Sequence, residues 1–116
     1  MKIRYMSDLH LEVSDFVPAR ADADVIILAG DIHTHTRGLD WAARHFPDTP
    51  IIYVAGNHEY YGAEIFEMTA QLCLCAAELG IHFLADDEVV IQGVRFIGST
   101  LWTDYALFGT EHQGAL

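Results

Sequence analysis

Basic residues are scarce in this sequence. It has 6 Lys and Arg residues against 17 Asp and Glu, and its formal net charge is −11 with neutral histidines. Proteins that bind nucleic acids or anionic membranes without specificity depend on fields of Lys and Arg, so we expect neither kind of partner. An acidic chain can still act on a phosphorylated substrate if cations bind in its site, because a bound metal is often the largest local charge.

Cysteines and long apolar runs are scarce too. The two cysteines are Cys73 and Cys75, and no other Cys or His lies nearby at the spacing of a zinc ligand set. We therefore expect them to be ordinary helix residues in a reducing compartment. The longest strongly apolar run, residues 25–29, is far too short to span a bilayer, and the N-terminus shows no signal-peptide core. These patterns predict a cytoplasmic protein without a membrane partner.

Short apolar segments with strand and helix periods make up much of the chain. The predicted strands cover residues 3–6, 25–29, 51–55 and 81–84, followed by a hairpin of residues 89–91 and 94–97. Continuous apolar runs stopped by glycine are typical of buried parallel strands. Apolar residues at helical spacing predict helices over residues 39–46 and 65–79. Together these elements predict an α/β chain with mainly parallel central strands, flanking helices and a C-terminal hairpin.

Polar clusters follow the first three predicted strands. They are Asp8-Leu9-His10, Gly30-Asp31-Ile32-His33 and Gly56-Asn57-His58-Glu59. Each cluster alone is weak, because Asp, Asn and Gly are common where strands turn. The carboxyl ends of parallel strands lie side by side and are where such sheets bind ligands. A set of carboxylate, amide and imidazole groups at one edge suits Mn²⁺, Fe, Zn²⁺ or Mg²⁺.

The order and spacing of D-x-H, G-D and G-N-H-E resemble the first three signature blocks of the calcineurin-like metallophosphoesterase superfamily. The resemblance covers about residues 2–105 and includes the stretch Gly98-Ser99-Thr100-Leu101-Trp102. It implies the N-terminal half of a metallophosphoesterase α/β sandwich. It also implies hydrolysis of phosphate monoesters or diesters by metal-activated water at a site with two divalent metal ions.

The resemblance further implies a role for each matched residue. Asp8 and His10 would ligate the first metal, Asp31 would bridge both metals, and Asn57 would ligate the second metal through its side-chain oxygen. His58 would protonate the leaving oxygen or stabilise charge on the phosphoryl group. The substrate would be a phosphorylated small molecule, a nucleotide or a phosphoprotein.

Two departures from the family pattern qualify these expectations. Many relatives carry an acidic residue three positions after the G-D aspartate, where it orients the catalytic histidine, whereas this chain has Thr34. The family also completes its site with later histidines, including a G-H-x-H pair, and nothing after Trp102 matches them, His112 included. We therefore interpret residues 1–116 as a single partial domain and expect it to self-associate through uncovered sheet.

Two alternatives to an active phosphoesterase stay open at this point. The first is a truncated or degenerate family member that binds metal weakly or serves as an interaction surface. The second is an unrelated α/β binding domain whose polar loops merely resemble the motifs. Three ordered motifs at strand ends make the second alternative the weaker one.

Overall fold

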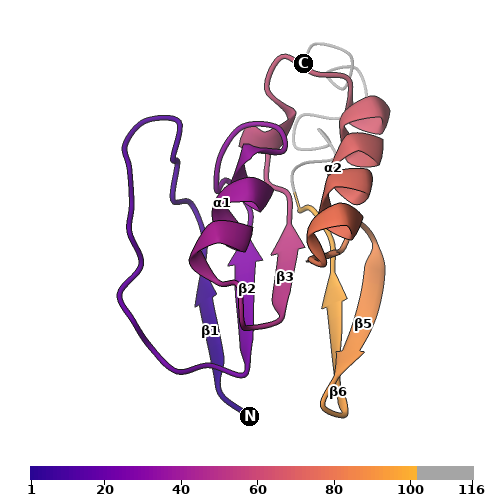
Figure 1. Cartoon of the computed structure of the whole chain (residues 1–116). Coiled ribbons are helices and arrows are strands. Elements are labelled where there is room, and N and C mark those ends of the chain that lie inside the picture. The colour runs from indigo at the N-terminus through magenta and orange to yellow at the C-terminus, as the bar shows by residue number, and fades with distance from the viewer. Residues whose placement is uncertain (102–116) are drawn as a thin grey trace, which may run out of the picture.

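A four-stranded parallel sheet forms the centre of the molecule. The structure is a computed structural model that describes residues 1–101 of the chain. The strands lie in the order β1 (Ile3–Met6), β2 (Val25–Ala29), β3 (Ile51–Val54) and β4 (His82–Phe83). All neighbouring pairs are parallel, so the carboxyl ends of the strands share one edge of the sheet, at the top of Figure 1. The predicted α/β class and the parallel central strands are confirmed.

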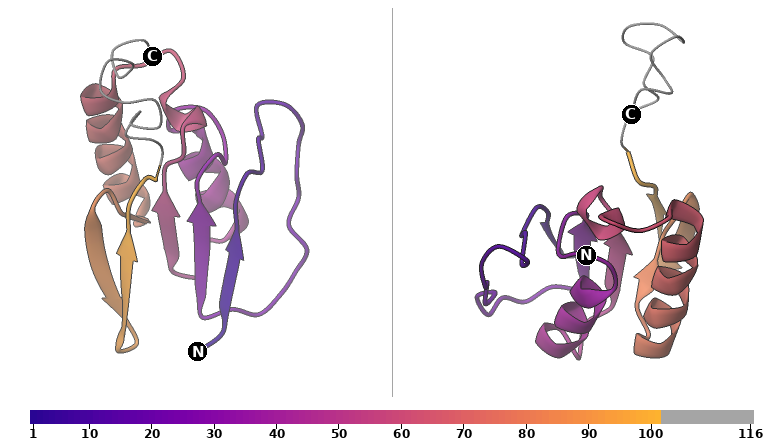
Figure 2. Two further views of the ribbon diagram at one scale, coloured as in Figure 1. Left: turned by 180° about the vertical axis from the view of Figure 1, so that it is seen from behind. Right: turned by 90° about the horizontal axis from the view of Figure 1, so that it is seen from above.

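Two helices cover one face of this sheet (Figures 1 and 2). They are α1 (Arg37–His45) and α2 (Ile65–Leu79). The core between the helices and the sheet includes Leu39 and Leu72 from the helices and Ile26, Leu28 and Tyr53 from the strands. Burial of these apolar side chains stabilises the sheet. The carboxyl ends of its strands, from which the loops begin, are therefore fixed in position. Within residues 1–101, neither helix has the length and apolar character needed to cross a bilayer.

A capping side chain marks the start of α2, and a glycine marks its end. The Glu64 side chain caps the helix by accepting a hydrogen bond from the Glu67 backbone N–H at 2.8 Å. The helix ends at Gly80, which adopts a left-handed conformation with φ of 71°. Both predicted helices are therefore present at or within two residues of the expected bounds.

A β-hairpin packs on the other face of the sheet. It consists of β5 (Asp87–Ile91) and β6 (Val94–Gly98), joined by Gln92 and Gly93 with φ of 52° and 77°. These positive values are those of a tight hairpin turn. Apolar side chains of the hairpin contact Val25, Ile52 and Leu84 on the sheet. β5 begins at Asp87, two residues before the predicted first strand of the hairpin.

The hairpin leaves the β1 side of this face open. Ile3 and Tyr5 project from β1 on the side away from the helices, and they are 44% and 79% exposed. β1 is also an edge strand of the sheet within the described residues. An apolar edge strand is a site where a second surface can pack, so self-association through this region stays a prediction.

Candidate metal centre

The loops after β1 and β2 are joined by backbone hydrogen bonds. The N–H groups of Asp8, His10 and Leu11 donate to the carbonyls of Gly30, Asp31 and Ile32 at 2.9, 3.0 and 2.9 Å. These bonds continue the β1–β2 pairing beyond the strands themselves. The D-x-H segment and the G-D segment therefore lie side by side because of main-chain contacts.

The backbone is strained at three of the predicted metal ligands. Asp8, His10 and Asp31 have φ of 56°, 49° and 53°, in the left-handed region that non-glycine residues seldom adopt. Such conformations cost about 1–3 kcal/mol each and are retained where the surrounding structure imposes them. Here the interloop hydrogen bonds impose them, and the side chains are turned toward one shared space.

Two glycines allow the loops after β2 and β3 to touch. A Cβ on Gly30, whose φ is 91°, would lie 2.9 Å from the backbone nitrogen of Gly56. A Cβ on Gly56 would lie 2.3 Å from Oδ1 of Asp31. Neither position can hold a side chain without movement of the other loop or of the Asp31 carboxylate.

The Glu59 side chain joins the loops after β2 and β3 by hydrogen bonds. It lies in the short 3₁₀ helix η1 (His58–Tyr60), which the sequence patterns did not predict, and it is 0% exposed. Its carboxylate accepts hydrogen bonds from the backbone N–H groups of Asp31, Ile32 and Gly56 and from the Tyr53 hydroxyl, at 2.8–3.0 Å. A buried carboxylate with this many donors is well compensated for the loss of water.

The Tyr53 hydroxyl keeps its proton and donates it in a hydrogen bond to Glu59. Burial, with the nearby Glu59 charge as a second cause, raises the pKa of Tyr53 well above its usual value. No role for Glu59 was predicted from the sequence. Its burial depends on η1 turning the chain back beneath β3, and no local pattern in the sequence marks that turn.

Three of the predicted metal ligands meet in this framework. Asp8, His10 and Asp31 each offer one ligand atom, and these atoms all lie within 4.8 Å of one another. Nε2 of His10 lies 3.6 Å from Oδ1 of Asp8. Two carboxylates and an imidazole in such proximity form a donor set for a divalent transition metal or Mg²⁺.

Asn57 lies against the same carboxylate. With its amide nitrogen facing Asp31, it reaches Oδ1 at 3.2 Å and Oδ2 at 3.0 Å. The opposite amide orientation would present the side-chain oxygen in the same place, which is the orientation a cation requires. The described residues thus fit a first cation with Asp8, His10 and Asp31, and offer Asp31 and Asn57 toward a second. Their ligand roles stay predictions.

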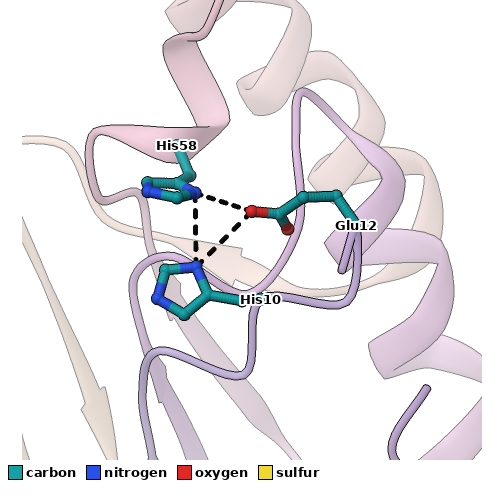
Figure 3. A group of neighbouring side chains, drawn as sticks. All are labelled: His10, Glu12 and His58. Carbon is teal, nitrogen blue, oxygen red and sulfur yellow. Dashed lines mark hydrogen bonds and ion pairs between the residues drawn. The ribbon is translucent and has the colours of Figure 1, made fainter. Parts of the chain in front are cut away.

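His58 contacts this cluster through both its backbone and its ring. Its N–H donates to Oδ1 of Asp31 at 2.8 Å. Its Nδ1 lies 2.6 Å from Oε1 of Glu12 and 3.2 Å from Nδ1 of His10, as Figure 3 shows. The hydrogen bond to Glu12 raises the pKa of His58. Glu12 was absent from the residues singled out in the sequence.

The other histidines near the site have different surroundings. His33 lines a cavity of about 600 Å³ beside α1, together with Arg37 and Trp41. His35 donates from Nε2 to the Tyr61 carbonyl at 2.6 Å. Neither belongs to the groups of three or more potential metal-binding side chains in residues 1–101. His112 lies outside the described residues.

Comparison with known proteins places this geometry in context. Residues 1–108 match the family described as calcineurin-like phosphoesterase. The chain is 29% identical over 135 residues to uncharacterized protein L509 of Acanthamoeba polyphaga mimivirus, covering 95% of this chain and 47% of that protein. It therefore spans about half the length of the curated relative it matches.

A solved structure shares the fold. It is the phosphopantetheinyl hydrolase PptH from Mycobacterium tuberculosis, with a TM-score of 0.58 and 20% sequence identity. The match covers 90% of this chain and 44% of the hydrolase. This chain thus shares the fold of about 44% of that protein.

Proposed function

Because this chain belongs to the calcineurin-like phosphoesterase family, we propose that it forms the metal-binding part of a hydrolase that cleaves phosphate esters. One observation carries the proposal. Asp8, His10 and Asp31 bring their ligand atoms within 4.8 Å of one another at the carboxyl edge of the sheet. The substrate is a phosphomonoester or phosphodiester carried by a small molecule, a nucleotide or a protein.

Asp8, His10 and Asp31 would hold a first cation, and Asn57 together with Asp31 would contribute to a second. Bound divalent cations, of which Mn²⁺, Fe, Zn²⁺ and Mg²⁺ suit these donors, supply the positive charge that acidifies water and stabilises phosphoryl oxygens. The Asp31 carboxylate already accepts a hydrogen bond from the His58 backbone N–H at 2.8 Å, and the Asp31 backbone N–H donates to Glu59 at 2.9 Å, so little rearrangement of the carboxylate is needed.

His58 supplies the proton that the departing alcohol needs. Water forms the new bond to phosphorus and releases one proton to solvent, while the bond from phosphorus to the ester oxygen breaks. The ester oxygen takes a proton from Nε2 of the protonated His58 ring, and the ring regains one from solvent. Nε2 is the nitrogen left for this step because Nδ1 is directed at Glu12, at 2.6 Å, and the ester oxygen would replace the Tyr61 hydroxyl, which lies 3.1 Å from Nε2.

A Mn²⁺ titration combined with an esterase assay tests this function. We expect about one tightly bound Mn²⁺ per chain and slow hydrolysis of bis(4-nitrophenyl) phosphate that rises with added Mn²⁺. Asp31→Asn should abolish both, whereas His33→Ala, which changes a histidine outside the cluster, should abolish neither. Metal binding without Mn²⁺-dependent hydrolysis at any concentration would contradict the catalytic proposal.

A non-catalytic metal-binding role is the second candidate. It is favoured by the ligand count, because residues 1–101 offer the second cation only Asp31 and Asn57 among the matched motifs. Two protein ligands, one of them a neutral amide, are few for a tight site. A chain that binds two Mn²⁺ tightly and turns over at ~1–10³ s⁻¹ would exclude this candidate and direct attention to His33, His35 and His112.

A further inference from the structure

We propose that Glu12 is the positioning residue for His58, deciding which ring nitrogen faces the substrate. The inference rests on the proposed function in one respect, the role of His58 as proton donor. Oε1 of Glu12 lies 2.6 Å from Nδ1 of His58, the shortest contact that the ring makes. The two side chains are only 20% and 22% exposed, so the interaction is partly shielded from solvent.

A tight turn in the chain positions Glu12 beside the His58 ring. The N–H of Val13 donates to the His10 carbonyl at 2.9 Å, which closes a tight turn after the D-x-H segment. The turn brings Glu12 back over His10 and against η1, where His58 lies (Figure 3). Residues 46 positions apart in the chain thus form a charge-assisted hydrogen bond.

Thr34 does not supply this contact. The resemblance to the family places an acidic residue there, but the Thr34 hydroxyl accepts a hydrogen bond from Arg37 at 2.9 Å and faces Nδ1 of His33 at 3.3 Å. In the described part of the chain, the carboxylate that reaches the ring of His58 is the one from Glu12. Glu12 therefore takes the place of the missing acid from a different loop.

The consequence is a defined tautomer. An ionised carboxylate only accepts hydrogen bonds, so Nδ1 of His58 must carry a proton. In the neutral ring Nε2 is then an acceptor, and it lies 3.1 Å from the Tyr61 hydroxyl. Nε2 is therefore the ring nitrogen that faces the ester oxygen in the proposed reaction.

The same carboxylate serves a second histidine. Nδ1 of His10 lies 3.4 Å from Oε1 of Glu12, and Nε2 of His10 faces Asp8. A proton on Nδ1 leaves the Nε2 lone pair free for a cation, as in other carboxylate–histidine–metal arrangements. Glu12 thus sets the orientation of both His10 and His58, with His58 the closer partner.

Nitrogen NMR on histidine-labelled protein tests the tautomer directly, without any activity. At alkaline pH, where the ring is neutral, we expect the His58 proton on Nδ1 in the parent chain. Glu12→Ala should move it to Nε2, and Glu12→Gln should retain it on Nδ1 because the amide oxygen still accepts. Glu78→Gln removes the same charge from an exposed position on α2 and should change nothing. An unchanged His58 tautomer in Glu12→Ala would overturn the proposal.

Leaving-group dependence and metal content complete the test. Relative to the parent, Glu12→Ala should lower Mn²⁺-dependent hydrolysis of phenyl esters by about 10–100-fold, and of 4-nitrophenyl esters by clearly less, because a good leaving group needs little protonation. At saturating Mn²⁺ the number of ions bound per chain should not change, even where the looser His10 ring lowers the affinity. Loss of one Mn²⁺ at saturation would make Glu12 a metal ligand and overturn the positioning role. A parent chain without any hydrolysis would defeat the proposed function and leave the tautomer result to decide the role of Glu12.

Discussion

The two halves of the predicted metal site are held by different kinds of contact. The inner half, with Asp31, Asn57 and His58, lies on loops that the fully buried Glu59 fastens together. The outer half, with Asp8 and His10, lies on a segment held by main-chain hydrogen bonds, and its side chains are 61% and 34% exposed.

Because of this difference, we expect changes in the inner half to affect both folding and metal binding, and changes in the outer half to affect metal binding alone. Glu59 connects two loops through the core, so a change there should disturb the fold and the site together. The outer side chains contribute little burial, so their replacement should alter metal affinity while leaving the fold intact. The following variants test this division, beginning with the largest expected effect.

Glu59→Ala should have the largest effect on stability. It leaves buried N–H groups of Asp31, Ile32 and Gly56 without an acceptor, at a cost on the order of 3–5 kcal/mol of unfolding free energy. Tyr53→Phe is the matched control, because it removes one of the same hydrogen bonds and should cost about 1.5–3 kcal/mol. Urea unfolding measures both, and equal losses in the two variants would show that the buried carboxylate does not fasten the loops.

Asp31→Asn should have the largest effect on metal content among variants that fold. The amide keeps the shape and removes the charge that we propose serves both cations, so Mn²⁺ affinity should fall by more than the ~10–100-fold that follows loss of a residue hydrogen-bonded to a ligand. His33→Ala should retain the parent metal content. Elemental analysis after dialysis compares them, and equal metal in the two variants would contradict the bridging role of Asp31.

Asp8→Asn should give a smaller and purely local change. Its side chain is 61% exposed, so the variant should unfold at the same urea concentration as the parent. Mn²⁺ affinity should fall by about 10-fold, because one charged ligand is lost from a site that retains His10 and Asp31. Calorimetric titration and urea unfolding check the pair of expectations. A loss of stability comparable to that of Glu59→Ala would remove the distinction between the two halves.

Tyr5→Ser should have the smallest effect, and it concerns the open side of β1. Tyr5 is 79% exposed beside Ile3 on the uncovered face, and its loss should weaken self-association by about 1–2 kcal/mol. Phe66→Ser replaces an 83% exposed aromatic residue on α2 and should have no such effect. Sedimentation velocity at several concentrations distinguishes them, and identical behaviour would place the association surface elsewhere.

Much of the fold could be predicted from local patterns. The apolar run of β2 and the period of α2 identify their elements, and Gly80 identifies the end of α2, because each signal depends only on neighbouring residues. The convergence of Asp8 and Asp31 followed from the rule that parallel strand ends share an edge.

Glu12 and Glu59 could not be assigned in that way. Glu12 acts across 46 positions through a turn that no apolar pattern marks. Glu59 is a charged residue next to a polar loop, which in a sequence suggests exposure, yet its position in η1 buries it completely. In both cases the role depends on tertiary contacts that bring donors to a carboxylate.

The contact between Gly30 and Gly56 also determines which sequences this site can tolerate. Even the smallest side chain at Gly56 would occupy the space of the Asp31 carboxylate, and one at Gly30 would strike the backbone of Gly56. A mutational library built to change the substrate should therefore leave both positions unvaried and diversify the outer loop instead. Homologous chains with any other residue at either position should have rebuilt the neighbouring loop or lost the metal.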